Sequence, residues 1–292
     1  MTTLSNPTKV QLHPHDRIPQ KQGPLLDYVL TAYRPKDSLQ QKWHSMSLLF
    51  HFLRLHKMQQ QMKPILKSLY LHLGPNKIVW GVKYAFGMPS LELYFYNHCQ
   101  NAEGNPMAIS KLVSVLSPHL QIASVVDEKI PYIMCSLELT PKHLQQRKSE
   151  GFRMYLAGSQ QQEGYDGVSF LITQNQHVRE NEYSFFYDKN APALQKLLTG
   201  SQFIAPYLKQ AFPERYATCH SICYSAKQQS DALYFSRIST TNLRHFAKAH
   251  FSTCISPVLE THPDKFSHLC WDIGYDISAP FAIRKVGMYG FL

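Results

Sequence analysis

The sequence predicts an α+β fold in which about ten antiparallel β-strands close into a barrel surrounded by helices. Three observations support this prediction. Strand-like segments come in five pairs, and helical segments separate them at a period of about 50 residues. The pairs also resemble one another, because WGVKY and LELYFYN in the first are echoed by HSICY and DALYFSR in the fourth. Finally, one face of the strands is too aromatic to be left in water.

The chain begins with a segment that is expected to be a flexible arm. Residues 1–23 are polar and rich in proline, which is typical of a segment outside a packed core. Residues 24–292 are predicted to form one domain. This domain opens with two segments in which Leu and Phe recur at helical spacing, 24–33 and 38–74.

From Lys77 onward, alternation and residues typical of β-structure indicate strands. We expect five strand pairs, at 77–86 and 91–98, 131–139 and 151–158, 167–174 and 180–188, 217–226 and 231–238, and 268–277 and 283–292. Helices are expected between them at 107–120, 141–150, 191–212 and 240–251. In the first and fourth pairs two tyrosines are spaced alike, a spacing that suggests partners across a hairpin: Tyr84 with Tyr94, and Tyr224 with Tyr234.

Helices are expected to cover one face of this sheet, so the environment of the other face has to be inferred from its residues. That side would carry Trp80, Tyr84, Tyr94, Tyr96, Tyr155, Tyr224, Tyr234, Trp271 and Tyr289. An open sheet with a solvated second face is the alternative. Because so large an aromatic surface is unfavourable in water, we favour closure into a barrel with an aromatic lumen.

The bulk composition limits the function classes. The 292 residues are 44% hydrophobic and 17% charged, which indicates a folded chain with a substantial core. The net charge of +10 is spread singly among apolar residues, which disfavours nucleic acid or a membrane as partner and fits a site for a small anion. The polar N-terminus, the lack of a long apolar run and six scattered cysteines predict a cytoplasmic protein with reduced thiols.

Several familiar site motifs are absent from the sequence. It contains no DDxxD run, GxGxxG, P-loop or GxSxG motif. Cys219, His220 and Cys223 are residue types that bind metals, but no second Cys/His pair lies at zinc spacing. We therefore interpret them as packing residues and predict no metal ligands.

The stretches FRMYLAG, CHSICYSAKQQSDALYFSR and RKVGMYGFL carry a resemblance to a known family. From about residue 77 to residue 292, the chain resembles the ABBA-type aromatic prenyltransferases, hairpin by hairpin. The resemblance implies the prenyltransferase barrel, made of αββα repeats, and transfer of a prenyl group from a diphosphate to an aromatic acceptor. The turn AKQQS followed by LYF is similar, more loosely, to the peptide-modifying prenyltransferases of cyanobactin pathways.

The resemblance implies a diphosphate site built from basic and tyrosine side chains. It assigns this role to Arg153, Tyr155, Arg179, Tyr183, Tyr224 and Lys285, to which the internal repeat adds Tyr234. Strand alternation agrees, because each basic residue lies two or four positions from a tyrosine and so shares a strand face with it.

The sequence departs from the family pattern at two places. Ala232 stands where relatives have an arginine, and Lys227 or Arg237 is the expected substitute. The acidic residue that binds magnesium in some members has no clear counterpart here. A requirement for Mg²⁺ is therefore open, and no other cofactor is predicted.

The chemistry of prenyl transfer suggests the remaining site residues. Ionisation of an allylic diphosphate leaves an anion, which Arg, Lys and Tyr donors stabilise, and a carbocation, which aromatic faces stabilise by about 0.5–2 kcal/mol each. The prenyl and acceptor pocket is expected to contain Trp80, Tyr84, Tyr94, Trp271, Tyr275 and Tyr289. Glu92 is the candidate catalytic residue, because it shares a strand face with Tyr94 and Tyr96 and is able to accept a hydrogen bond from the acceptor.

The predicted function is therefore an aromatic prenyltransferase that uses dimethylallyl or geranyl diphosphate and an indole or phenol natural product. Two alternatives stay open, namely an aromatic side chain in a peptide as acceptor, and a non-catalytic barrel that binds a ligand. Individual residues also have a simpler interpretation. Arg153, Arg179, Lys285 and Glu92 would then be ordinary solvent-exposed charges, and Trp80 and Trp271 would be core residues packed under a helix.

Overall fold

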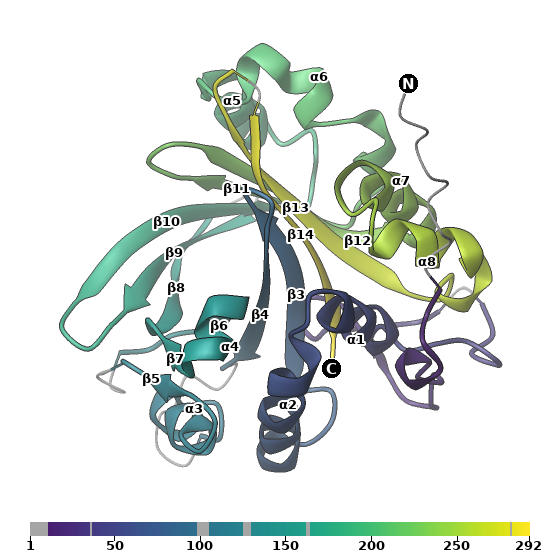
Figure 1. Cartoon of the computed structure of the whole chain (residues 1–292). Helices are drawn as coiled ribbons and strands as arrows, with labels where there is room; N and C mark the ends of the chain where they lie inside the picture. Colours follow the sequence, from purple (N-terminus) through teal and green to yellow (C-terminus); the bar gives the residue numbers. More distant parts are fainter. Residues whose placement is uncertain (1–10, 36, 98–104, 125–129, 162–163, 281) are drawn as a thin grey trace, which may run out of the picture.

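Ten strands form a closed barrel in the computed structural model, which describes residues 11–35, 37–97, 105–124, 130–161, 164–280 and 282–292 (Figure 1). Their order around the barrel is β10-β11-β12-β13-β14-β3-β4-β6-β8-β9, and every neighbouring pair is antiparallel. The predicted fold class is confirmed.

The barrel strands form five pairs that follow one another along the chain. They are β3 (Ile78–Ala85) with β4 (Met88–Tyr96), β6 (Met134–Leu139) with β8 (Phe152–Gln161), β9 (Gly164–Ile172) with β10 (His177–Phe186), β11 (Ile222–Ala226) with β12 (Asp231–Ser239), and β13 (Cys270–Ser278) with β14 (Ala282–Phe291). The last strand, β14, pairs with the first, β3, and this contact closes the barrel.

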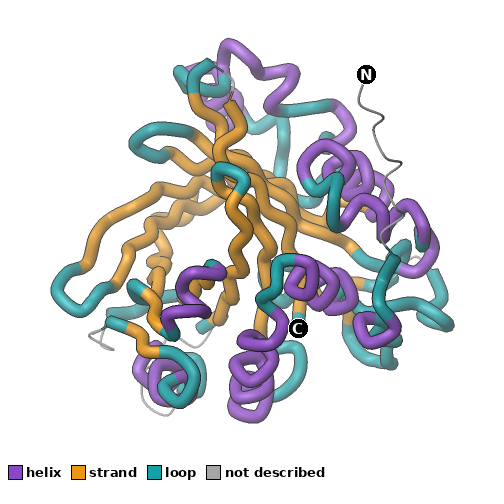
Figure 2. The backbone as a smooth tube through the Cα atoms, in the orientation of Figure 1, coloured by secondary structure: helices purple, strands orange, loops and turns teal. Residues whose placement is uncertain are grey.

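Helices lie outside the strands (Figure 2). They are α1 (Met46–Leu55), α2 (Gln59–Leu73), α3 (Ile109–Leu116), α4 (Pro141–Gln146), α5 (Pro192–Gly200), α6 (Leu208–Ala211), α7 (Thr240–His250) and α8 (Ile255–Thr261). The hydrophobic core fills the layer between helices and barrel, where Phe52 of α1 and Trp80 of β3 are fully buried. Burial of these side chains holds the helices on the outer face of the barrel.

Residues 24–33, which were predicted to be helical, instead form a small hairpin of β1 (Leu25–Leu26) and β2 (Ala32–Tyr33). The Asp27 carboxylate accepts hydrogen bonds from the backbone N–H groups of Val29 and Thr31, at 3.1 and 2.8 Å. Asp side chains that bind the backbone in this way favour turns over helices. The prediction was wrong because this local turn outcompetes the weak helical periodicity.

The predicted helix at 38–74 is likewise divided. Helix α1 begins only at Met46, and it is separated from α2 by a short turn in which Lys57 adopts a positive φ of 57°. The single helix predicted here is therefore two helices joined by a turn at Lys57.

Short elements complete the fold. They are the two-stranded sheet of β5 (Gln121–Ile122) and β7 (Lys148–Ser149), and the 3₁₀ turns η1 (Pro14–Asp16), η2 (Ala205–Tyr207), η3 (Glu214–Tyr216) and η4 (Pro263–Lys265). The first ten residues of the expected N-terminal arm lie outside the described residues. The next part packs against α1, where Leu12 and Asp16 are buried and Arg54 donates to the Asp16 carboxylate at 2.8 Å.

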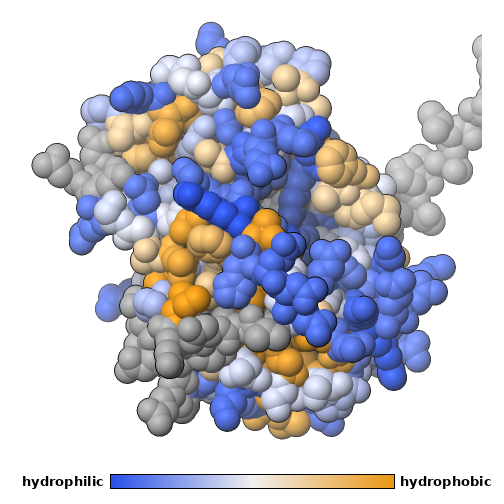
Figure 3. Space-filling model, turned by 90° about the vertical axis from the view of Figure 1, so that its left-hand side faces the viewer, coloured by the Kyte–Doolittle hydropathy of each residue, from blue (hydrophilic) through white to orange (hydrophobic). Residues whose placement is uncertain are grey.

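Hydrophilic residues cover much of the face shown in Figure 3, with hydrophobic patches between them. Within the described part of the chain, no helix is both long enough and apolar enough to cross a bilayer. Five cysteines are described, and these five are not joined in disulfides: Cys135, Cys219, Cys223, Cys254 and Cys270. Cys99 lies outside the described residues.

Candidate active site

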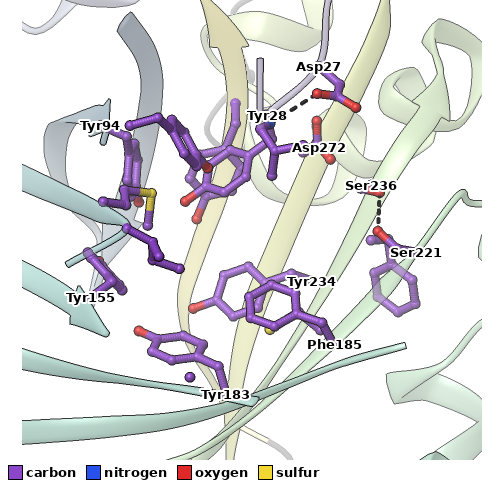
Figure 4. A pocket seen from close by; sticks show the side chains of 18 of the residues that line it. Asp27, Tyr28, Tyr94, Tyr155, Tyr183, Phe185, Ser221, Tyr234, Ser236 and Asp272 are labelled. Atoms are coloured by element: carbon purple, nitrogen blue, oxygen red, sulfur yellow. Dashed lines mark hydrogen bonds between the residues drawn. The ribbon is translucent and has the colours of Figure 1, made fainter. Parts of the chain in front are cut away.

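Alternate residues of the barrel strands line a cavity of about 370 Å³ (Figure 4). On β4, for example, Glu92, Tyr94 and Tyr96 line the cavity, whereas Leu91 and Leu93 belong to the core beneath the helices. The cavity is rich in tyrosine, with Tyr28, Tyr94, Tyr96, Tyr155, Tyr165, Tyr183, Tyr187, Tyr234 and Tyr289 around it. Its size lies within the range of small-molecule sites.

Burial keeps the phenols of this cavity in their neutral form. It raises the pKa of Tyr183 to about 12. Burial also raises the pKa values of Tyr94 and Tyr289 well above the usual value, with a further contribution from the Tyr28 hydroxyl group at Tyr94 and from the Asp276 charge at Tyr289. A neutral phenol carries an O–H that donates a hydrogen bond, and its ring face attracts a cation. The lumen therefore offers both anion donors and cation-stabilising surfaces.

Four basic side chains enter one part of the lumen from different strands, each paired with a carboxylate. Arg153 of β8 contacts Glu138 at 3.0 Å and Glu180 at 2.8 Å. Lys285 of β14 lies 3.4 Å from Glu138. Lys227, in the turn after β11, contacts Asp276 at 2.6 Å, and Lys83 of β3 contacts Glu92. Because carboxylates match these cations in number, the empty cluster is close to neutral.

The Lys83–Glu92 pair is the most buried of these contacts, with side chains 5% and 2% exposed. Glu92 also accepts hydrogen bonds from the hydroxyl groups of Tyr94, at 2.8 Å, and Ser136. Burial and the nearby Lys285 charge lower the pKa of Lys83 well below its usual value. The Lys83 ammonium lies 5.4 Å from the Tyr94 ring centre, so a cation already occupies the aromatic surface here.

A second group of charges lies at another edge of the cavity, where Asp27 and Asp272 are side by side (Figure 4). Arg237 binds the Asp27 carboxylate through two nitrogen atoms, each at 2.8 Å. Burial and the Asp27 charge raise the pKa of Asp272 to about 8, although the nearby backbone of Arg237 and Tyr28 opposes this shift. This edge is acidic, in contrast to the cluster around Lys285.

Eight of the predicted site residues come together at the lumen. They are Glu92, Tyr94, Arg153, Tyr155, Tyr183, Tyr234, Lys285 and Tyr289. Of the two expected substitutes near Ala232, Lys227 lies in the basic cluster, whereas Arg237 lies with Asp27 at the acidic edge. The roles of these residues stay predictions.

Six predicted site residues lie elsewhere, and for Tyr84 and Tyr224 the hairpin register explains why. Trp80, Tyr84, Tyr224, Trp271 and Tyr275 pack against the helical layer. A two-residue turn pairs Ala85 with Met88, so Tyr84 lies opposite Pro89 and shares a face with it. Tyr94 therefore lies on the other face from Tyr84. The four-residue turn between β11 and β12 separates Tyr224 from Tyr234 in the same way, so the expected cross-hairpin pairing of these tyrosines was wrong.

Arg179 is the sixth residue outside the cavity. The register of β10 shifts between Arg179 and Asn181, so that Arg179 lies opposite Phe170 while Asn181 lies opposite the buried Ser169. A β-bulge changes the face on which the following residues lie. The Arg179 side chain is 60% exposed and pairs with Glu182 at 2.6 Å. Counting by twos from Tyr183 therefore placed Arg179 on the wrong face.

Several lumen residues were not predicted, although the sequence carries a signal for some of them. In β13, Asp272, Gly274 and Asp276 alternate with Trp271, Ile273 and Tyr275, so one face is apolar and the other is polar. The apolar face packs under helices, and the polar face is the one that lines the lumen. The same alternation in β3 would have placed Lys83 on the lumen face. Strand alternation gives no signal for Tyr28, because it lies in the turn between β1 and β2, outside the barrel strands.

Among the described residues, no group of three or more His, Cys, Asp or Glu side chains is arranged to hold a metal ion. The lumen carboxylates Glu92, Glu138 and Asp276 are each engaged with a basic side chain. The predicted interpretation of Cys223 as a packing residue is consistent with its burial at the cavity wall.

Comparisons with known proteins add little to this description. No protein-family model matches the sequence, and no curated protein matches it. Among solved structures, the chain is similar to the apo crystal structure of a prenyltransferase, PriB, with 10% sequence identity and a TM-score of 0.44. The match covers 84% of this chain and 94% of that chain. A likeness of this size bears on neither family nor reaction.

Proposed function

We propose that this chain is an aromatic prenyltransferase, which moves an allylic group from its diphosphate to an electron-rich aromatic acceptor held in the barrel lumen. One observation carries the proposal: four basic side chains meet a belt of neutral tyrosines inside one closed barrel. The basic cluster suits an anionic leaving group, and the aromatic belt suits a carbocation. Both are needed in the same place for this reaction.

The diphosphate is expected to bind at Arg153, Lys227 and Lys285. These side chains are 25%, 16% and 26% exposed, so they are more accessible than Lys83. The closest ion-pair contact of Lys285 is the longest of the three, at 3.4 Å from Glu138, so an incoming anion would displace the least favourable of these pairs. Charge-assisted hydrogen bonds from these groups would stabilise pyrophosphate as it leaves.

The reaction would begin when the allylic C–O bond breaks and its electron pair leaves with the pyrophosphate. A carbon of the acceptor ring then bonds to the allylic cation, and the ring loses a proton to pyrophosphate or to a lumen carboxylate. The faces of Tyr94, Tyr234 and Tyr289 would shield the cation from water without reacting with it. The cavity of about 370 Å³ has the size of a small-molecule site, and it continues into a second cavity with which it shares Tyr96, Tyr165 and Tyr187, so dimethylallyl and geranyl diphosphate are both proposed as donors.

A second candidate is a barrel that binds an aromatic ligand without transferring anything. One observation favours it: each of the four basic side chains already contacts a carboxylate. If those contacts are permanent, the cluster has no net charge to offer a diphosphate. The two candidates differ in whether a diphosphate binds at all.

The test is mass spectrometry of the purified protein with dimethylallyl or geranyl diphosphate and a panel of indoles, phenols and aromatic peptides. The reactions are run with Mg²⁺ and again with EDTA, so that a metal requirement is measured. Calorimetry with a non-reactive thiolodiphosphate analogue measures donor binding separately. A product heavier by one prenyl unit supports the transferase. Failure to bind the analogue would overturn it and favour the binding barrel.

A further inference from the structure

The lumen has two charged regions that lie well apart on one strand. Asp276 of β13 pairs with Lys227 and lies opposite Lys285 on β14, so it marks the basic cluster. Asp272 lies four residues earlier on the same face, opposite Tyr289. At roughly 3.3 Å per residue, the two carboxylates are about 13 Å apart along the strand. That spacing leaves room for an aromatic ring and a short prenyl group between them.

Asp272 is a buried carboxylate with an unused oxygen. The residue is 6% exposed, and it lines the cavity. Its Oδ1 atom has no hydrogen-bond partner among the described residues. The arginine beside it does not compensate, because Arg237 is bound to Asp27 through two contacts of 2.8 Å. A buried polar atom without a partner is costly, which points to a ligand group that completes it.

Asp27 beside it is in a different position, since its hydrogen-bonding capacity is used. One carboxylate oxygen accepts from the backbone amides of Val29 and Thr31, and the other accepts from Arg237. Asp272 is therefore the carboxylate of this edge that is available to a ligand.

Glu92, the carboxylate expected to hold the acceptor, has no such capacity. One of its oxygens accepts from Lys83 and Tyr94, and the other accepts from Ser136. A ligand would have to displace one of these buried partners. Glu92 is thus already the counterion of Lys83, which makes Asp272 the better candidate to hold the acceptor.

We propose that Asp272 binds a cationic amine on the aromatic acceptor, which holds the acceptor ring against Tyr28 and Tyr289 with its amine facing away from the basic cluster. The inference rests on the proposed function in one respect, namely that the bound aromatic amine is called the acceptor of a prenyl group. Tyr28 and Tyr289 are in edge contact, with ring centres 5.1 Å apart, and both line the cavity. A buried carboxylate without a cationic partner selects an ammonium group over a neutral or anionic one.

Without a bound cation, Asp272 is protonated at neutral pH, so binding of an ammonium group has to be accompanied by loss of this proton. Burial and the adjacent Asp27 raise its pKa to about 8, and a bound ammonium would oppose both effects. The tyrosines around it are neutral, because burial raises the pKa values of Tyr28 and Tyr96 well above the usual value. Asp27, the other acid at this edge, is already bound by Arg237 and by the backbone amides of Val29 and Thr31.

The test is calorimetric binding of three probes that share one ring system: tryptamine, indole-3-ethanol and indole-3-acetate. Wild-type protein is expected to bind tryptamine at least about tenfold more tightly than the alcohol, and the acid more weakly than the alcohol. Asp272→Asn is expected to weaken tryptamine binding by roughly 10- to 100-fold and to leave the alcohol unchanged. Glu182→Gln, which removes the same charge from a side chain that is 64% exposed and outside the cavity lining, is the matched control and is expected to keep the preference for the amine.

The proposal is overturned if wild type binds the alcohol as tightly as the amine, if it binds none of the probes, or if Asp272→Asn keeps the preference. Circular dichroism shows whether Asp272→Asn is folded. If it is not, the preference of wild-type protein for tryptamine over indole-3-ethanol still tests the proposal. No donor is present in these measurements. A chain that prefers the amine but transfers no prenyl group would therefore overturn the proposed function and leave this site standing.

Discussion

The ring of Tyr234 lies over Gly274, its partner on the neighbouring strand of the barrel wall. A Cβ atom at Gly274 would be 2.2 Å from Cδ1 of Tyr234, closer than non-bonded atoms approach. Gly81 has the same relationship to Tyr289, with a distance of 2.5 Å. Glycines in the wall thus make room for tyrosine rings, and the lumen stays open because the rings lie against the wall.

Substitution of Gly274 by alanine should therefore displace the Tyr234 ring. We expect the free energy of unfolding to fall by about 1–3 kcal/mol, because overpacking forces the ring or the strand to move. Urea denaturation measures the change. Gly200→Ala is the matched control, since nothing lies within 4 Å of a Cβ there and alanine favours the helix. Equal stability of the two variants would contradict the packing described.

Removal of Lys285 or Arg153 should weaken donor binding. Each variant to alanine loses a charge-assisted hydrogen bond to the diphosphate, which corresponds to roughly a tenfold or greater loss of affinity. Calorimetry with the thiolodiphosphate analogue measures it. Arg179→Ala removes the same charge from a position that is 60% exposed and outside the cavity, so it should bind the analogue normally. A loss in Arg179→Ala as large as in Arg153→Ala would argue for a non-specific charge effect.

Loss of the Tyr28 ring should let water reach the allylic cation. Tyr28 contacts Tyr94 and Tyr289, with ring centres 5.2 and 5.1 Å away. In Tyr28→Ala we expect a larger share of prenyl alcohol relative to prenylated acceptor, because water is less well excluded. Chromatography of both products measures the ratio. Tyr28→Phe keeps the ring and should retain the wild-type ratio; a shift there would assign the effect to the hydroxyl group instead.

The pH dependence of stability should change in Asp272→Asn. The pKa of Asp272 is raised from 3.8 to about 8, so the folded protein keeps this carboxyl protonated while the unfolded chain ionises it. Wild-type stability is therefore lost between about pH 4 and 8, by up to about 1.4 kcal/mol per pH unit for one proton. The variant lacks this loss. The free energy of unfolding of Asp272→Asn, measured by urea denaturation, should therefore rise relative to that of wild type from pH 5 to pH 8. A constant difference would show that Asp272 ionises normally.

Much of the fold could be predicted from local patterns. Alternation and turn residues indicated the five strand pairs in order, because period-two alternation and turn-forming residues are local features of the sequence. The same alternation correctly grouped Arg153 with Tyr155 and Lys285 with Tyr289, since residues two or four apart in a regular strand share a face. This rule holds only where the strand is regular, and it fails at the β-bulge between Arg179 and Asn181.

The sequence by itself determined which residues of a strand share a face, and so which basic and aromatic side chains act together. Only the tertiary structure decided which face is the lumen. That choice depends on where the helices pack and on turn lengths, since a two-residue turn placed Tyr84 and Tyr94 on opposite sides of the wall. Tyr28 and Asp272 meet across more than 240 positions of the chain because folding, not local pattern, brings the first hairpin to the barrel.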